Sequence, residues 1–155
     1  MFFNISTIQQ AAALPLRAFD GELRVLLVTA RSDGRWLLPK GWIEDGETPA
    51  RSAAREAFEE AGVTGRLDPR PVGAFRYAKS MPQGYAVRSH VTVFPLAVHE
   101  ELDDWPEEAE RTREWFALDG ARDAVGDRGL ARLLKRLHRR EADSLRLVVE
   151  NLASA

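Results

Sequence analysis

The chain has no cysteine among its 155 residues. This absence excludes disulfides, zinc–thiolate sites, iron–sulfur clusters and thiol nucleophiles. It is compatible with a reducing compartment, and we expect a cytoplasmic protein. The sequence also lacks any apolar run near the roughly 18 residues that a membrane-spanning helix needs. The N-terminal segment has no basic region, and Gln9 and Gln10 interrupt its apolar residues, so we do not interpret it as a signal peptide.

An excess of charge of either sign is also missing, because the formal net charge is -2. We therefore expect no bulk attraction to nucleic acid or to membranes. Apolar residues make up 45% of the chain and charged residues 30%, a composition typical of globular proteins. A chain of this length can bury a core without cross-links, and we expect residues 1–155 to form a single domain.

Turn residues divide much of the sequence into short apolar segments. Residues 8–18 and 23–29 flank Asp20-Gly21, which predicts a β-hairpin. Residues 39–46 contain turn-forming glycines and are predicted to form a loop. The remaining expected strands lie at residues 36–38, 65–78, 85–98 and 113–118.

The central part of the sequence predicts a helix. Thr48 followed by Pro49 is typical of an N-cap and a first helical residue. Residues 51–61 are rich in Ala, Arg and Glu, and Gly62 is a natural stop. Two further helices are expected at 119–125 and 130–137, with the basic residues 132–140 as a solvated face. Strands, one central helix, more strands and terminal helices together indicate an α+β sandwich.

Three carboxylates are clustered on the central helix. Glu56, Glu59 and Glu60 share one face, since residues three and four apart are neighbours. Alanines form a separate stripe that lets the helix lie close to a sheet. Clustered carboxylates repel one another, and a divalent cation would offset that repulsion. Mg²⁺ prefers oxygen ligands and binds substrate phosphates, as phosphoanhydride cleavage requires. The alternative interpretation is a solvated acidic face.

The spacing of residues in and before this helix is a far more specific pattern than two adjacent glutamates. Residues 41–63 fit the pattern G-x5-E-x7-R-E-U-x-E-E-x-G-U, in which Ala57 and Val63 fill the two U places. From average composition, a chance match at a given start is on the order of 1 in 10⁸. The pattern is the Nudix box, and the chain resembles the Nudix hydrolase family. The seven fixed positions are Gly41, Glu47, Arg55, Glu56, Glu59, Glu60 and Gly62.

This resemblance implies a Nudix-type α/β/α sandwich with a mixed sheet, in which the box forms a loop–helix–loop motif, and it implies Mg²⁺ or Mn²⁺ as cofactor. Arg55 and Glu47 resemble a structural pair that holds the loop against the helix, and Glu47 is a further candidate metal contact. The general base differs among family members, and Glu59 is our candidate. The implied metal ligands are Gly41, Glu56, Glu59 and Glu60.

Segments outside the box are similar to the diphosphoinositol polyphosphate phosphohydrolase subfamily. They are residues 28–31, 35–41 and 113–116. Members of this subfamily cleave inositol pyrophosphates and often diadenosine polyphosphates. One departure concerns the mouth of the site, because Lys40 and Trp42 stand where the animal enzymes carry glycines.

A substrate with many phosphates needs several basic side chains, and arginine is favoured for two-pronged contacts. Arg17, Arg31 and Arg88 are most similar to the phosphate-binding positions of the subfamily. Each basic residue could instead be an ordinary surface charge. The full set of candidate substrate-binding residues is Arg17, Arg31, Lys40, Arg76, Lys79 and Arg88.

Two other functions stay open. One is a nucleotide-directed Nudix pyrophosphatase acting on ADP-ribose, a nucleoside triphosphate or the 5′ end of RNA. Tyr77 lies near the place of an adenine-stacking tyrosine in related enzymes, although a sheet tyrosine is the simpler interpretation. The other is a non-catalytic ligand sensor. In such a protein we would expect the catalytic glutamates to be replaced, whereas Glu56, Glu59 and Glu60 are all present.

Overall fold

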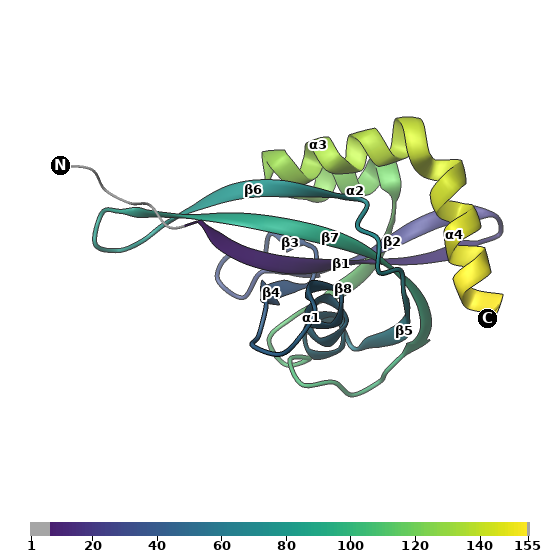
Figure 1. The fold of residues 1–155 in the computed structure, drawn as a ribbon, viewed down its shortest axis with the longest axis horizontal. Coiled ribbons are helices and arrows are strands. Elements are labelled where there is room, and N and C mark those ends of the chain that lie inside the picture. Colours follow the sequence, from purple (N-terminus) through teal and green to yellow (C-terminus); the bar gives the residue numbers. More distant parts are fainter. Residues whose placement is uncertain (1–6, 155) are drawn as a thin grey trace.

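The fold places one mixed β-sheet between two layers of helices (Figure 1). The computed structural model describes residues 7–154, with the backbone alone at Lys79 and Ser80. The two longest strands, β1 (Ile8–Phe19) and β7 (Ala86–Glu101), run parallel at the centre of the sheet. Helix α1 (Pro49–Glu56) covers one face, and helices α3 (Arg128–Arg136) and α4 (Ala142–Ser154) cover the other. The predicted α/β/α sandwich is confirmed.

The predicted N-terminal hairpin is also present. Strand β2 (Glu22–Thr29) pairs antiparallel with β1, so that Leu16 lies opposite Val25. Strands β3 (Trp36–Leu37) and β8 (Arg113–Ala117) pair antiparallel with β2. The segment that leads into β8 contacts the last turn of the Nudix helix, through Trp105 and Arg111.

The single strand expected over residues 65–78 is instead two strands, β5 (Val63–Leu67) and β6 (Gly73–Ser80). Pro69 and Pro71 interrupt the ladder because proline has no backbone N–H to donate. Asp68 adds a turn by accepting a 2.9 Å hydrogen bond from the backbone N–H of Arg70. The strand β7 is long enough to pair with both, β5 along its C-terminal half and β6 along its N-terminal half.

The loop expected over residues 39–46 contains a short strand, β4 (Lys40–Trp42). Its three residues pair antiparallel with residues 10–12 of β1, and Gly41 lies opposite Ala11. Glycine and proline in the local sequence predicted a loop here, but hydrogen bonding to a distant strand overrides that preference. The pairing brings the start of the Nudix box to the middle of the sheet.

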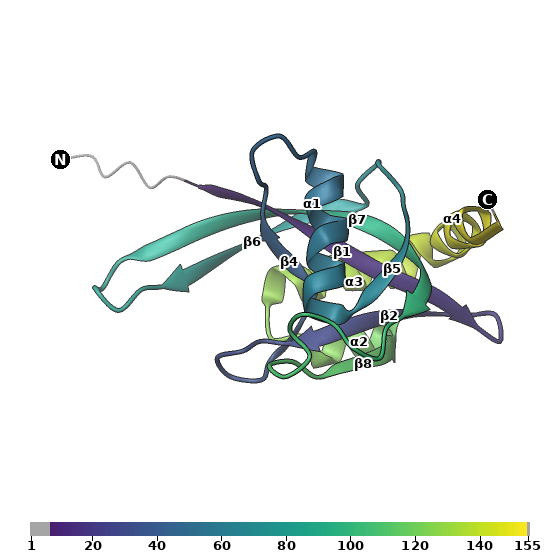
Figure 2. The same cartoon turned by 90° about the horizontal axis from the view of Figure 1, so that it is seen from below.

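Helix α1 begins and ends as the sequence predicted. The Thr48 side chain accepts a 3.2 Å hydrogen bond from the N–H of Arg51, and Gly62 ends the helical segment in the left-handed conformation. The last turn, η1 (Ala57–Ala61), widens into a π-helix. Ala53, Ala57 and Ala61 are completely buried against the sheet, which lets the helix lie closely across β1 (Figure 2).

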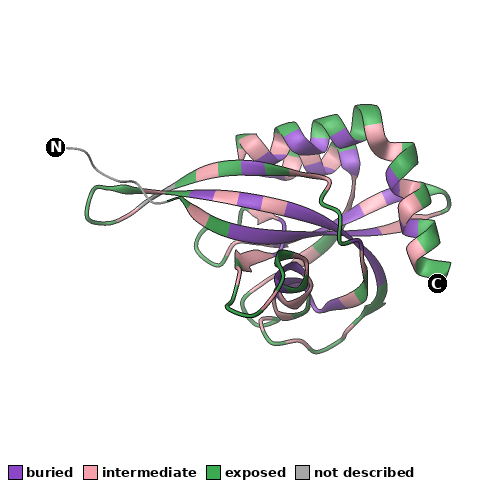
Figure 3. Cartoon of the chain, viewed as in Figure 1, coloured by how far each residue is buried: buried purple, intermediate pink, exposed green. Residues whose placement is uncertain are grey.

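The second helical layer is more extensive than the sequence predicted. Helix α2 (Leu118–Ala124) precedes α3, which continues through a π-helical turn, η2 (Leu137–Glu141), into α4. The leucines of the predicted amphipathic helix, among them Leu130 and Leu134, are buried against the sheet. Figure 3 shows buried and exposed positions alternating along this helix. In the part of the chain that the structure describes, no helix is both long and apolar enough to cross a membrane.

Candidate active site

The start of the Nudix box lies directly against its helix. Strand β4 brings Gly41 so close to Glu56 that a Cβ atom on residue 41 would overlap the Glu56 carboxylate. Any larger residue at position 41 would therefore force the Glu56 carboxylate to shift. The first residue of the motif thus contacts its helix, although 15 positions separate Gly41 from Glu56 in sequence.

Glu56 and Glu60 form a buried pair of carboxyl groups, with side chains 11% and 8% exposed. Burial raises the pKa of both, and that of Glu60 rises to about 8 although Arg111 opposes the change. The two groups also affect each other, because the charge of Glu56 raises the pKa of Glu60 further. Glu60 also accepts a 3.2 Å hydrogen bond from the backbone N–H of Lys40. A cation beside this pair would favour the ionised form of both carboxyl groups.

Arg55 ties the loop to the helix. Its Nε lies 3.1 Å from Glu47, and its Nη1 lies 2.9 Å from Glu56 and 3.4 Å from Glu59. The predicted Arg55–Glu47 pair is thus observed. Ser52 donates a 2.9 Å hydrogen bond to Glu47, which lowers the pKa of that carboxyl group, and Arg55 lowers it further. Glu59 is the most accessible of the three helix glutamates, with a side chain 37% exposed.

Sequence reasoning missed Arg111, which contacts the site from the segment before β8. Its side chain is 7% exposed, and its Nη2 lies 3.4 Å from Glu60. It also pairs with Glu107 at 3.0 Å and donates a 2.9 Å hydrogen bond to the carbonyl of Thr29. No local pattern marks it, since about fifty residues separate it from Glu60. The segment around it, residues 103–112, is rich in acidic residues, so local composition gave no signal for a buried arginine either.

Arg113 holds the end of the same helix. It donates hydrogen bonds to the carbonyl groups of Ala61 and Gly62, at 2.9 and 3.2 Å, and stacks over Trp105 at 4.0 Å. A cation at a helix C-terminus satisfies free carbonyls and opposes the helix dipole. The last helical turn, which carries Glu59 and Glu60, is therefore held at its C-terminal end as well.

Lys40 is the predicted substrate-binding residue closest to the glutamates. Its Nζ lies 3.2 Å from the Tyr77 hydroxyl and 4.7 Å from the centre of that ring. The hydroxyl in turn donates a 2.8 Å hydrogen bond to Gln10. Lys40 and Tyr77 line a small cleft of ≈ 60 Å³ together with Trp36, Phe75 and other residues. The backbone N–H of Lys40 contacts Glu60, whereas its side chain lines this cleft, in which no glutamate of the box takes part.

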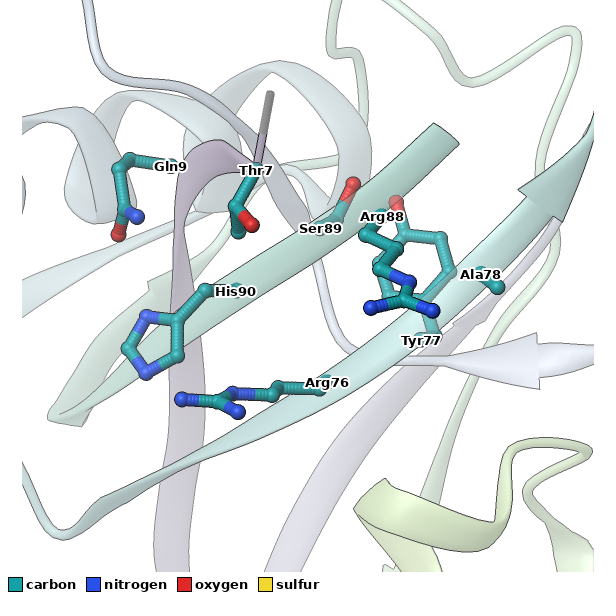
Figure 4. Close-up of a pocket in the computed structure, with 8 residues that line it drawn as sticks. All are labelled: Thr7, Gln9, Arg76, Tyr77, Ala78, Arg88, Ser89 and His90. Carbon is teal, nitrogen blue, oxygen red and sulfur yellow. The ribbon is translucent and has the colours of Figure 1, made fainter. Parts of the chain in front are cut away.

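Arg76 and Arg88 line a larger open hollow of ≈ 600 Å³ on strands β6 and β7, with Gln9 and His90 beside them (Figure 4). Both arginine side chains are exposed. The backbone of Lys79 belongs to β6, but its side chain lies outside the described part of the structure. The structure thus brings two of the predicted basic residues together.

Arg17 and Arg31 are not brought to this group. Arg17 is five positions beyond Ala12, the partner of Lys40, which is about 16 Å along a strand. It lies 5.7 Å from the ring of Trp115 and contacts the carbonyl of Val98. Arg31 is exposed and pairs with Glu110 at 3.4 Å. The six predicted residues therefore do not form one site.

The candidate metal ligands supply the right chemistry but are not gathered into a cage. Among residues 7–154, no three acidic or histidine side chains are placed to hold one ion together. Arg55 and Arg111 occupy positions beside the carboxylates. The available donors are all oxygens, from Glu56, Glu60 and the nearby backbone of Gly41, and oxygen ligands suit Mg²⁺ and Mn²⁺.

Comparison with known proteins agrees with this architecture. A solved structure of a MutT protein from Methanosarcina mazei Go1 resembles the fold with a TM-score of 0.67 and 21% identity, and the match covers 89% of this chain and 97% of that one. A C. elegans Ap4A hydrolase binary complex resembles it with a TM-score of 0.65 and 20% identity, and that match covers 88% of this chain and 99% of the other. At such identities the likeness concerns the fold alone.

Sequence relatives are more similar. Nudix hydrolase 12, mitochondrial, from Arabidopsis thaliana is 35% identical over 142 residues, which cover 85% of this chain and 66% of that protein. Diphosphoinositol polyphosphate phosphohydrolase 3-alpha from Mus musculus is 40% identical over 117 residues, covering 73% and 66%. The chain spans about half to two thirds of the length of such relatives. The NUDIX domain family matches residues 7–137. The chain therefore belongs to the Nudix family.

Proposed function

We propose that this protein is a Nudix hydrolase that uses Mg²⁺ or Mn²⁺ to cleave a phosphoanhydride bond. The observation that carries the proposal is the buried Glu56–Glu60 carboxyl pair packed against Gly41. Two buried carboxyl groups are poorly solvated, and a divalent cation would stabilise both in the ionised form. We also propose a cytoplasmic location, on the cysteine-free composition.

The chain's own residues divide the work as follows. Glu56, Glu60 and the Gly41 carbonyl would hold the ion, with Glu59 beside them. When bound, such an ion neutralises phosphate oxygens and lowers the pKa of a coordinated water. Glu59, the most accessible carboxylate, is our candidate to accept the proton of the attacking water. Arg55 and Glu47 keep the loop and these carboxylates in register.

The proposed substrate is a polyphosphorylated small molecule, either a diphosphoinositol polyphosphate or a diadenosine polyphosphate. The 40% identity to the mouse diphosphoinositol polyphosphate phosphohydrolase supports this class. So do the exposed Arg76 and Arg88 and the ammonium group of Lys40, which are suited to bind phosphates.

A nucleotide substrate is the second candidate. Trp36, Phe75 and Tyr77 line the small cleft beside Lys40 and could contact a base. ADP-ribose, a nucleoside triphosphate or an RNA 5′ end would then replace the inositol compound. A non-catalytic sensor is the remaining alternative, and the three retained glutamates argue against it.

Phosphate release from a substrate panel tests the proposal. The panel holds an inositol pyrophosphate, a diadenosine polyphosphate, ADP-ribose and nucleoside triphosphates, with Mg²⁺, Mn²⁺ or EDTA. We expect EDTA-sensitive cleavage of one of the first two, reduced at least about 100-fold in Glu56→Gln. Glu108→Gln, an exposed glutamate of the same charge, is the matched control.

Each other outcome has a definite meaning. Cleavage of ADP-ribose or a triphosphate alone would keep the chemistry and replace the substrate class. Equal rates with and without EDTA would contradict metal dependence. Binding of a panel member with no turnover in any metal would favour the sensor.

A further inference from the structure

The basic face of α3, which the sequence predicted to be merely solvated, borders a second hollow. This hollow has a volume of ≈ 620 Å³ and lies between strand β6 and helix α3. Arg128, Arg132 and Arg136 line it from successive turns of the helix, since residues four apart share a face. Arg76 lines it from β6. Four arginines from two elements thus converge on one concave surface.

Most of this positive charge has no acidic partner in the described part of the chain. Among residues 7–154, Arg76, Arg128 and Arg132 make no ion pair or side-chain hydrogen bond. The one acidic lining residue, Asp127, uses its carboxylate to cap α3 through a 2.8 Å hydrogen bond from the N–H of Leu130. Only Arg136 is paired, with Glu141 at 3.0 Å. Neighbouring like charges repel, and a bound anion would remove that cost.

The second hollow borders the first. Arg76 and His90 line both, so a basic surface continues past β6 from Arg88 to α3. The buried Nδ1 of His90 has no hydrogen-bond partner in the described part of the chain. Because that atom is enclosed, the arginines are the groups that a ligand in either hollow would contact.

We propose that the hollow between β6 and α3 is a second anion-binding site, which takes a small molecule carrying several phosphate groups. Arginine favours this ligand class because its planar guanidinium donates paired hydrogen bonds to phosphate oxygens. No glutamate of the Nudix box lines the hollow, so binding there requires no metal. The phosphates have two possible sources: the distal groups of a substrate held at the glutamates, or a separate polyphosphate ion.

Titration of tripolyphosphate into metal-free protein, followed by calorimetry, tests the site. The site variant is Arg128→Gln/Arg132→Gln. The matched control is Arg139→Gln/Arg140→Gln, which removes the same two charges from exposed positions outside the hollow. We expect binding by the wild type and the control, and binding at least about tenfold weaker in the site variant. Equal affinities in the two variants, or no binding by the wild type, would overturn the proposal.

Turnover kinetics distinguish the two sources. A KM raised severalfold in the site variant, with kcat unchanged, would assign the hollow to distal phosphates of the substrate. An unchanged KM together with weakened tripolyphosphate binding would assign it to a separate ion. The calorimetric experiment needs no turnover, so failure of the proposed hydrolysis and failure of this site are separate results.

Discussion

The guanidinium group of Arg111 lies 3.4 Å from the carboxylate of Glu60, and both side chains are more than nine-tenths buried. The contact joins the segment before β8 to the last turn of the Nudix helix. It also continues outward, because Arg111 pairs with Glu107 and Glu107 lies 4.0 Å from Arg31. A line of alternating charges therefore runs from the buried carboxyl pair to the surface.

Replacement of Arg111 by methionine should destabilise the protein by about 3–5 kcal/mol above pH 8, where the buried Glu60 carboxylate is ionised and is left without its partner. Urea denaturation of metal-free protein measures the loss. Arg122→Met, which breaks only the outer pair with Asp123, should cost no more than about 1 kcal/mol. Equal losses of unfolding free energy in the two variants would show that the buried Arg111–Glu60 contact stabilises the fold no more than a surface ion pair does.

Gly41→Ala should displace the Glu56 carboxylate, because the added Cβ would occupy its position. We expect kcat/KM to fall at least about tenfold and Mn²⁺ affinity to weaken, since a small misplacement of a catalytic group is costly. Gly120→Ala is the control, since a Cβ there meets nothing within 4 Å. Wild-type activity and metal affinity in Gly41→Ala would refute the steric argument.

Arg55→Lys keeps the charge but loses the planar fork that reaches Glu47, Glu56 and Glu59. We expect kcat/KM to fall about 10- to 100-fold. The exposed Arg51→Lys on the same helix should behave as wild type. Steady-state kinetics of both variants would settle the comparison, and an active Arg55→Lys enzyme would mean that charge alone suffices.

The pH dependence of stability follows from Glu60. Burial, opposed by Arg111, raises its pKa to about 8 from an ordinary value of 4.5. The protonated form thus favours the folded state, and this contribution is complete below pH 4.5 and is lost as the pH rises to 8. Between these limits, the Tm of metal-free wild type should fall relative to that of Glu60→Gln.

A bound metal ion should offset the loss of stability that ionised Glu60 causes. Mg²⁺ added above pH 8 should raise the Tm of the wild type, because the ion replaces the lost proton. Glu60→Gln should gain much less. Thermal scans across this pH range, with and without Mg²⁺, provide the measurement. Parallel curves for the two proteins would contradict a role for Glu60 in the linkage.

Tyr77→Phe removes the hydroxyl that joins Lys40 to Gln10. The Lys40 ammonium should become less well placed, and we expect KM to rise about threefold to tenfold with little change in kcat. Tyr85→Phe is the control, since Tyr85 is exposed. A fall in kcat at constant KM would instead place Tyr77 in the chemical step.

Local sequence predicted the elements that local interactions form. The cap at Thr48, the stop at Gly62 and the buried alanine stripe all depend on residues within a few turns of one another. The strand boundaries were harder. The break at Pro69 and Pro71 divides residues 65–78, and the strand at Gly41 exists only because β1 supplies partners for it.

The sequence by itself determined the family, the order of most elements and the set of helix glutamates, because the spacing of the Nudix box records which residues must share a helix face. The tertiary structure alone decided which distant charges reach that face. Arg111 pairs with Glu60, Arg76 and Arg88 share a hollow, and Arg17 lies elsewhere. The reason is physical: helical periodicity relates residues a few positions apart, whereas contacts across a sheet depend on register and chain path.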